Sequence, residues 1–185
     1  MIIADAYAGI ARMFDYPQDA TELRTARDAL GSILDEHGLD CSLASFAMDA
    51  PLARMQEEYV ALFDFNPATA PYLGHHLFGD NQKKGGYMIG LKQEYGRHGF
   101  IPPGNELPDH LSVVLAFLAH LARKESATVR QAFITEKALP GIDRLCAAFA
   151  ERQDSPWRQV AEAARLVCTA DCTGRPDAHK EVASC

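Results

Sequence analysis

The chain has 185 residues, of which 48% are hydrophobic and 23% charged, and its formal net charge is -7. This length and composition predict one well-packed globular domain and argue against a largely disordered chain. The acidic excess repels phosphate backbones and so gives no support for nucleic-acid binding, and no apolar run approaches the roughly 18 residues that would suggest a membrane span.

Helical periodicity recurs along the whole chain, whereas no stretch alternates apolar and polar residues for the length of a strand. Apolar side chains spaced three and four apart are typical of helices that bury one face. We therefore expect an all-α fold, a single compact, bundle-like domain of about eight helices. It should span residues 1–171 and be followed by a flexible polar tail over residues 172–185.

The N-terminal half should begin directly with a helix. Its first residues lack the positively charged region of a secretory signal, so we expect a cytoplasmic chain without stable membrane insertion. Pro17 ends the first helix because the residue before a proline avoids helical angles, and Gly38 stops the second. Helices are expected over residues 2–14, from Thr21 to the stop at Gly38, and over 42–48, 51–64 and 72–78.

The C-terminal half contains the most apolar helix of the chain. It should begin near Pro108, which suits a first turn because its missing N–H would have no intrahelical partner there. Leucine and valine side chains from Leu111 to Leu121 widen its apolar face, which predicts a central helix that is buried on most sides. Further helices are expected over residues 86–98, 128–137, 141–151 and 156–169.

Metal-ligating side chains gather in the connection that follows residue 68. His75, His76 and Asp80 have the chemistry that zinc or iron prefers, and with Asp109 they suggest an alternative function as a metal-dependent hydrolase. Adjacent histidines point in different directions, however, and the chain has no His-Glu-x-x-His pattern. A polar loop contact is therefore the simpler interpretation.

The chain has five cysteines, an odd set without a regular framework, which predicts free thiols. Cys168, Cys172, His179 and Cys185 offer four zinc ligands near the C-terminus. Their spacing matches no common zinc finger, and the sequence leaves open whether the tail binds a metal.

Asp109 and His110 lie at the start of the predicted central helix, where a carboxylate interacts favourably with the helix dipole. Neither has an evident nucleophile partner, and the chain lacks a Gly-x-Ser-x-Gly elbow, so catalysis has little support. An apolar and acidic groove suited to an amphipathic, cationic peptide is the better interpretation. Its walls would be Tyr59, Phe63, Tyr72, Phe78, Phe100, Glu106, Asp109 and His110.

Several short motifs stand out across the same region. They are Tyr59-x-x-Leu62-Phe63-Asp64, His75-x-x-x-Gly79-Asp80, Tyr95-x-x-His98-Gly99 and Glu106-Leu107-Pro108-Asp109-His110-Leu111. Together with the early Phe14-Asp15-Tyr16-Pro17 they resemble the nitrate reductase maturation chaperones, the NarJ family, within the wider TorD/DmsD group of redox enzyme maturation proteins. The similarity covers about residue 5 to residue 125.

The resemblance implies a non-enzymatic chaperone that acts in the cytoplasm. Such a chaperone binds the N-terminal leader and apo form of a client, the catalytic subunit of nitrate reductase or of a related molybdoenzyme, and holds it for cofactor insertion and assembly. The client carries the molybdopterin guanine dinucleotide, so no cofactor is expected on this chain. The identity of the client and the choice between a monomer and a domain-swapped homodimer stay open.

In relatives the Asp-His pair at the start of the central helix lies near the leader-binding surface, and the resemblance implies this role for Asp109 and His110. The other motif positions are less specific. The client-binding residues predicted in this way are Tyr59, Phe63, Tyr72, His75, Glu106, Pro108, Asp109 and His110.

Overall fold

The computed structural model describes residues 2–41, 43, 46, 50–124, 127–152 and 155–173. All regular structure in these ranges is helical and they contain no strand, which confirms the all-α prediction. The nine α-helical segments reduce to eight separate helices, because α7 and α8 are joined through a π turn. No helix in this part of the chain is long and apolar enough to cross a lipid bilayer.

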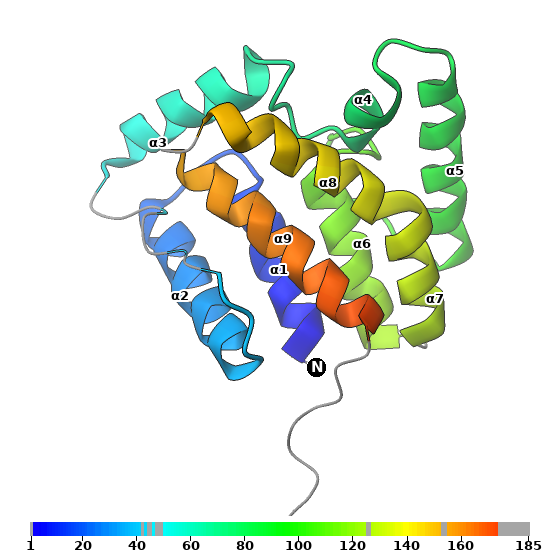
Figure 1. Cartoon of the computed structure of the whole chain (residues 1–185), viewed down its shortest axis with the longest axis horizontal. Helices are drawn as coiled ribbons and strands as arrows, with labels where there is room; N and C mark the ends of the chain where they lie inside the picture. Colours follow the sequence, from blue (N-terminus) through cyan, green and yellow to red (C-terminus); the bar gives the residue numbers. More distant parts are fainter. Residues whose placement is uncertain are drawn as a thin grey trace, which may run out of the picture.

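Figure 1 shows the order of the helices along the chain. The segments are α1 (Ile2–Met13), α2 (Ala20–Glu36), α3 (Leu52–Tyr59) with the π turn η1 (Val60–Asp64), α4 (Leu73–Phe78), α5 (Lys83–Arg97), α6 (Leu111–Lys124), α7 (Ala127–Phe133) with the π turn η2 (Ile134–Ala138), α8 (Leu139–Ala148) with the 3₁₀ turn η3 (Phe149–Glu151), and α9 (Pro156–Thr173).

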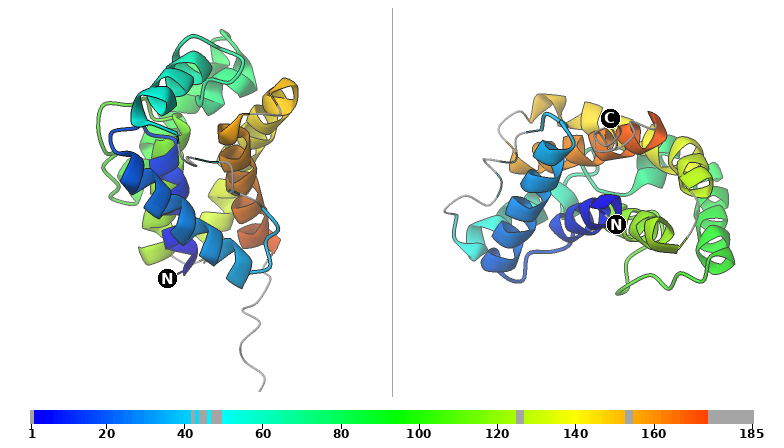
Figure 2. Two further views of the ribbon diagram at one scale, coloured as in Figure 1. Left: turned by 90° about the vertical axis from the view of Figure 1, so that its left-hand side faces the viewer. Right: turned by 90° about the horizontal axis from the view of Figure 1, so that it is seen from below.

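The centre of the molecule is formed by α6, in which nine of 14 residues are buried. Along its length α6 packs against α1, which also contacts α2 and α9. Seen from below, α1 and α6 form one layer and α8 and α9 a second layer against it, with α2 and α5 at the two sides (Figure 2). The prediction of a buried central helix is thereby confirmed.

An aromatic cluster fixes the C-terminal end of α1. The Trp157 indole lies edge-on to Phe63 and Tyr59, with ring centroids 5.8 and 6.1 Å away. Its Nε1 donates to the Met13 carbonyl at 3.0 Å, and the Tyr59 hydroxyl donates to the Phe14 carbonyl at the same distance. The last carbonyls of a helix have no intrahelical partner, so these two buried donors satisfy them and hold the residues that follow.

Several helix ends differ from the sequence-based prediction, each for a local reason. Helix α5 begins at Lys83 instead of residue 86, because the Asn81 side chain accepts a hydrogen bond from the Lys83 N–H at 3.0 Å. Helix α9 continues to Thr173 instead of ending near residue 169, and an ion pair of Asp171 with α7 fixes its last turn. The expected helix over 42–48 and the tail beyond Thr173 lie outside the described residues.

The two helices predicted over 128–137 and 141–151 form one continuous path from Ala127 to Glu151. Pro140 does not interrupt it, because the proline occupies the first turn of α8, directly after the π turn. A proline at this position loses no hydrogen bond that the helix needs.

Candidate functional site

A two-residue antiparallel bridge joins the start of α4 to the start of α6. The Leu73 N–H donates to the Asp109 carbonyl at 2.9 Å, and the Leu111 N–H donates to the Pro71 carbonyl at 2.7 Å. Tyr72 and His110 are the paired residues between them. Because Asp109 and His110 take part in this pairing, α6 begins at Leu111 and not near Pro108 as predicted.

Asp109 is fully buried beneath this bridge. Its Oδ2 accepts a hydrogen bond from the Gly74 N–H at 3.1 Å, and its Oδ1 has no hydrogen-bond partner among the described residues. Burial raises the pKa of the carboxyl group, because the low dielectric disfavours the charged form, while the nearby charges of Lys84 and His75 lower it.

His110 is also buried, with 2% of its surface exposed. Its Nδ1 lies 2.8 Å from Ser112 Oγ and accepts a longer bond from the Ser112 N–H, and the ring meets Tyr72 edge-on at 5.0 Å. Burial lowers the pKa of the imidazole, and the negative charge of Glu106 partly opposes this. His110 is therefore a neutral structural link between the bridge and the first turn of α6.

Above the bridge lies a surface of carboxylates and tyrosine rings. The Tyr72 hydroxyl donates to Glu106 Oε2 at 3.0 Å, and burial together with this hydrogen bond raises the pKa of Tyr72 to about 12. The charges of Glu106, Asp15 and Asp64 all act on buried Tyr59. Tyr16 is 42% exposed and packs edge-on against Tyr59. We call the group Asp15, Tyr16, Asp64, Tyr72 and Glu106 the acidic-aromatic surface.

Two carboxylates of this surface, Asp15 and Glu106, interact through their charges. Loss of hydration raises the pKa of Asp15, and the negative charge of Glu106 raises it further, whereas a hydrogen bond from Ser112 and the charge of Arg12 lower it. A cation that binds beside two like charges relieves their repulsion. Sequence reasoning did not include Asp15 among the site residues, although it is part of the Phe14-Asp15-Tyr16-Pro17 motif.

The eight predicted client-binding residues occupy one region but different depths. Tyr72 and Glu106 lie on the acidic-aromatic surface, and His75 is half-buried on α4. The other five are buried beneath them: Tyr59, Phe63, Pro108, Asp109 and His110. The Pro108 carbonyl accepts a hydrogen bond from the Tyr95 hydroxyl at 2.7 Å.

Two aromatic residues of the expected groove pack elsewhere. Phe78 contacts Tyr87 of α5 at a centroid distance of 5.6 Å, and Phe100 contacts Phe117 of α6 at 5.3 Å. Both rings are thus part of the packing of α5 and α6 against their neighbours.

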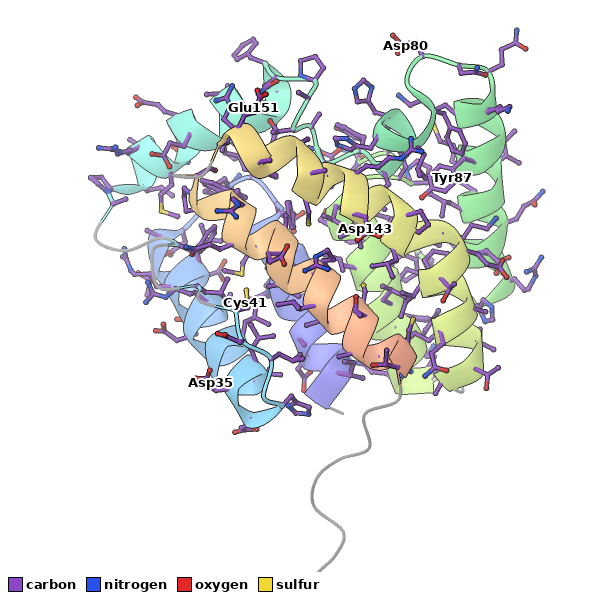
Figure 3. All side chains as sticks on the ribbon, in the orientation of Figure 1. Asp35, Cys41, Asp80, Tyr87, Asp143 and Glu151 are labelled. Atoms are coloured by element: carbon purple, nitrogen blue, oxygen red, sulfur yellow. The ribbon has the colours of Figure 1, made fainter. Side chains whose placement is uncertain are left out.

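The metal-ligand candidates do not converge. The His76 Nε2 donates to the Ala70 carbonyl at 2.7 Å, and Asp80 lies at the tip of the connection between α4 and α5 (Figure 3). His75 faces His76 edge-on at 5.7 Å, while Asp109 is bonded to Gly74. In the described part of the chain, no group of three His, Cys, Asp or Glu side chains could hold a metal ion. His179 and Cys185 of the tail lie outside it.

Comparison with known proteins gives a family assignment. Residues 17–162 match the family described as "Nitrate reductase delta subunit". The chain is 31% identical over 125 residues to the nitrate reductase molybdenum cofactor assembly chaperone NarJ of Escherichia coli (strain K12), which covers 63% of this chain and 52% of that protein. It is 34% identical over 104 residues to the probable NarJ chaperone of Bacillus subtilis (strain 168), covering 56% of this chain and 53% of the relative.

A third relative is the probable chaperone NarW of Escherichia coli (strain K12), 29% identical over 112 residues that cover 60% of this chain and 48% of the relative. The chain thus spans about half the length of the curated relatives it matches. The family match includes α2 to α8 and the start of α9. It also includes the bridge and the acidic-aromatic surface, except for Asp15 and Tyr16. The chain therefore belongs to the nitrate reductase delta subunit family, which confirms the resemblance seen in its motifs.

Proposed function

We propose that this protein is a cytoplasmic molybdenum cofactor assembly chaperone. Its client would be the apo form of the catalytic subunit of nitrate reductase or of a related molybdoenzyme, bound through the N-terminal leader. The family match and the function for which the relatives are named support the class of function. The observation that carries the binding site is the acidic-aromatic surface above the bridge.

The chemistry of this surface suits a cationic, amphipathic segment. Asp15, Asp64 and Glu106 are exposed carboxylates, and Tyr16 and Tyr72 offer ring faces and edges beside them. Phe65 and Leu107, each next in sequence to one of these acids, are 81% and 46% exposed. Carboxylates attract arginine and lysine side chains, and exposed apolar groups receive the other face of the peptide.

Binding of this kind can serve assembly without catalysis. A chaperone that recognises the unfilled client loses affinity when the client folds around its cofactor. The segment bound by the chaperone is then part of the folded client, and the two states compete for it. The free energy of client folding would therefore drive release. No reaction of the chaperone itself is required.

Calorimetric titration with synthetic N-terminal peptides of molybdoenzyme catalytic subunits tests the proposal. We expect saturable binding without cofactor, weakened up to about fivefold by Glu106→Gln, because one exposed charge contact contributes up to roughly 1 kcal/mol. Glu36→Gln is the matched control, since this exposed glutamate ends α2 beside Asp35, which Figure 3 places at the opposite end of the molecule.

The outcomes separate the function from the site. If no leader peptide binds in the absence of cofactor, the chaperone proposal fails. If a peptide binds but Glu106→Gln and Glu36→Gln have equal affinity, the assignment of the acidic-aromatic surface fails while the function stands.

A further inference from the structure

The fully buried Asp109 is closed to direct contact with a client. None of its surface is exposed, whereas Glu106, three residues earlier, lies in solvent. Both of its acceptor groups face α4, because Oδ2 receives the Gly74 N–H and the main-chain carbonyl receives the Leu73 N–H. These contacts place Asp109 between the start of α6 and the first turn of α4.

Asp109 thereby supplies the cap that α4 lacks locally. The first N–H groups of a helix have no intrahelical partner, and a side chain at the N-cap position normally accepts one of them. Tyr72 occupies that position in α4 and its side chain makes no capping hydrogen bond. Leu73 and Gly74 donate instead to a residue far away in sequence, so the cap fixes the position of α4 relative to α6.

Residue 74 has to be glycine for steric reasons. Its backbone does not have a positive φ angle, so conformational freedom is not the reason. A Cβ atom on residue 74 would lie 2.7 Å from Asp109 Oδ2 and 3.2 Å from Tyr87 Cδ1. Real Cβ atoms do not approach that closely, so any larger residue would push the carboxylate away. The Asp109 carboxylate can therefore reach the Gly74 N–H only because residue 74 has no side chain.

The position of α4 determines where Tyr72 lies. Tyr72 immediately precedes the capped turn, pairs with His110 in the bridge and holds Glu106 through its hydroxyl. At the other end of α4, Arg144 Nη1 donates to the carbonyls of His76 and Leu77 at 2.9 and 3.0 Å. With that end attached to α8, loss of the Asp109 cap would move the Tyr72 end.

We propose that Asp109 and Gly74 are positioning residues, which set Tyr72 against Glu106 on the acidic-aromatic surface and make no contact with the client. This inference rests on the proposed function. The aspartate of the Asp-His motif would thus act indirectly, by positioning Tyr72, and its charge would not contact the leader.

Substitutions at residue 109 separate the two roles. Asparagine keeps an oxygen for the Gly74 N–H and removes the charge. Alanine removes this side-chain acceptor and leaves only the main-chain carbonyl that receives the Leu73 N–H. In calorimetric titrations with the leader peptide, below the melting temperature of each variant, we expect Asp109→Asn to bind within about twofold of wild type. Asp109→Ala should bind about tenfold more weakly, since the capping contact is lost.

Gly74→Ala tests the same contact from its other side, with Asp109 intact. It should bind about tenfold more weakly than wild type, while Gly96→Ala, the control on α5 with open space around its Cβ, should bind like wild type. The dependence of affinity on salt should stay the same in all four variants, because the carboxylates of the surface are retained. A merely structural role would lower the melting temperature and leave affinity unchanged.

The inference is overturned if Asp109→Asn binds about tenfold more weakly than wild type with a reduced salt dependence, which would show that the client contacts the charge. It is also overturned if Gly74→Ala binds like Gly96→Ala. These results differ from a failure of the proposed function, in which the wild-type protein itself binds no leader. Since Asp109→Asn and Gly74→Ala each decide the question alone, the test does not depend on the folding of Asp109→Ala.

Discussion

We expect a large loss of stability when Arg130 of α7, which forms a buried ion pair with Asp171 of α9, is replaced by an uncharged residue. Arg130 Nε and Nη2 donate to Asp171 Oδ2 and Oδ1 at 2.5 and 2.8 Å, and the Tyr7 hydroxyl donates to Oδ2 at 2.8 Å. The two charged side chains are 9% and 6% exposed. Arg130→Met keeps much of the apolar stem but leaves the carboxylate with fewer donors in a poorly hydrated place.

Removal of one partner from a buried pair costs about 3–5 kcal/mol, because the remaining charge is uncompensated. For a domain of this size, 1 kcal/mol corresponds to roughly 2–4 °C, so the melting temperature should fall by about 6–20 °C. Urea denaturation followed by circular dichroism would measure the free energy of unfolding directly.

The matched control is the surface pair Arg123–Asp5, whose side chains are 53% and 58% exposed at a distance of 3.4 Å. Arg123→Met should change the free energy of unfolding by no more than about 1 kcal/mol. If Arg130→Met proves no more costly than Arg123→Met, the buried pair does not hold the end of α9 as argued.

Three further substitutions test other contacts. Thr69→Val should cost about 1–3 kcal/mol in urea denaturation, because the buried Thr69 hydroxyl donates to the Leu62 carbonyl at 2.5 Å in the π turn η1 and valine leaves that carbonyl unpaired. Gly141→Ala should cost about 1–3 kcal/mol in the same assay, because its Cβ would lie 2.9 Å from the Leu73 Cβ where α8 meets α4. His110→Asn should reduce the loss of stability between pH 7 and pH 5. Burial lowers the pKa of His110 in the folded state, so the unfolded chain takes up a proton more readily below about pH 6.5. Wild type therefore loses stability as the pH falls through that value.

Each of these has a simple contrary outcome. For the threonine, the control is Thr25→Val on an exposed face of α2, and equal effects at both sites would refute the role of the η1 contact. For the glycine, Gly31→Ala has open space around its Cβ and should be neutral or stabilising. For the histidine, parallel stability curves of the variant and wild type from pH 7 to pH 5 would contradict the argument.

The helices themselves could be predicted from the sequence, and α6 shows why. Its apolar residues occur so densely that only a central position buries them, and nine of its 14 residues are buried. Its first residue was predicted too early because Pro108 suits a helical first turn. Local sequence carries no information about the pairing of Asp109 with Leu73, which instead holds Asp109 and His110 in the bridge.

The site was less predictable because its contacts are long-range. Asp109 and Gly74 are separated by 35 positions, and helical periodicity does not show which connection will meet which helix end. The motif therefore indicated an important aspartate without indicating that it is buried. Asp15 was not predicted as a site residue, because an acidic residue after a helix is common in sequences. Its importance becomes visible only through its interaction with Glu106.

The segment from α7 to α8 was predicted as two separate helices, but it forms one continuous helical path. Pro140 is a helix breaker in most interior positions, so the sequence predicted two helices around it. The π turn Ile134–Ala138 changes the register of the main-chain hydrogen bonds just before the proline. The pattern of apolar residues does not reveal such a turn, because a π turn is a single-turn insertion too short to set up a period of its own.

The chain contains a single tryptophan, Trp157, which is 1% exposed and lies edge-on to Tyr59 beneath the acidic-aromatic surface. Its fluorescence should therefore be emitted at the short wavelengths of an apolar environment and be excited in part by energy transfer from Tyr59. Tyr16 packs on the outer side of Tyr59, so one ring layer separates the indole from that exposed ring. The fold thus contains its own optical reporter, with which docking at that surface could be followed without a label.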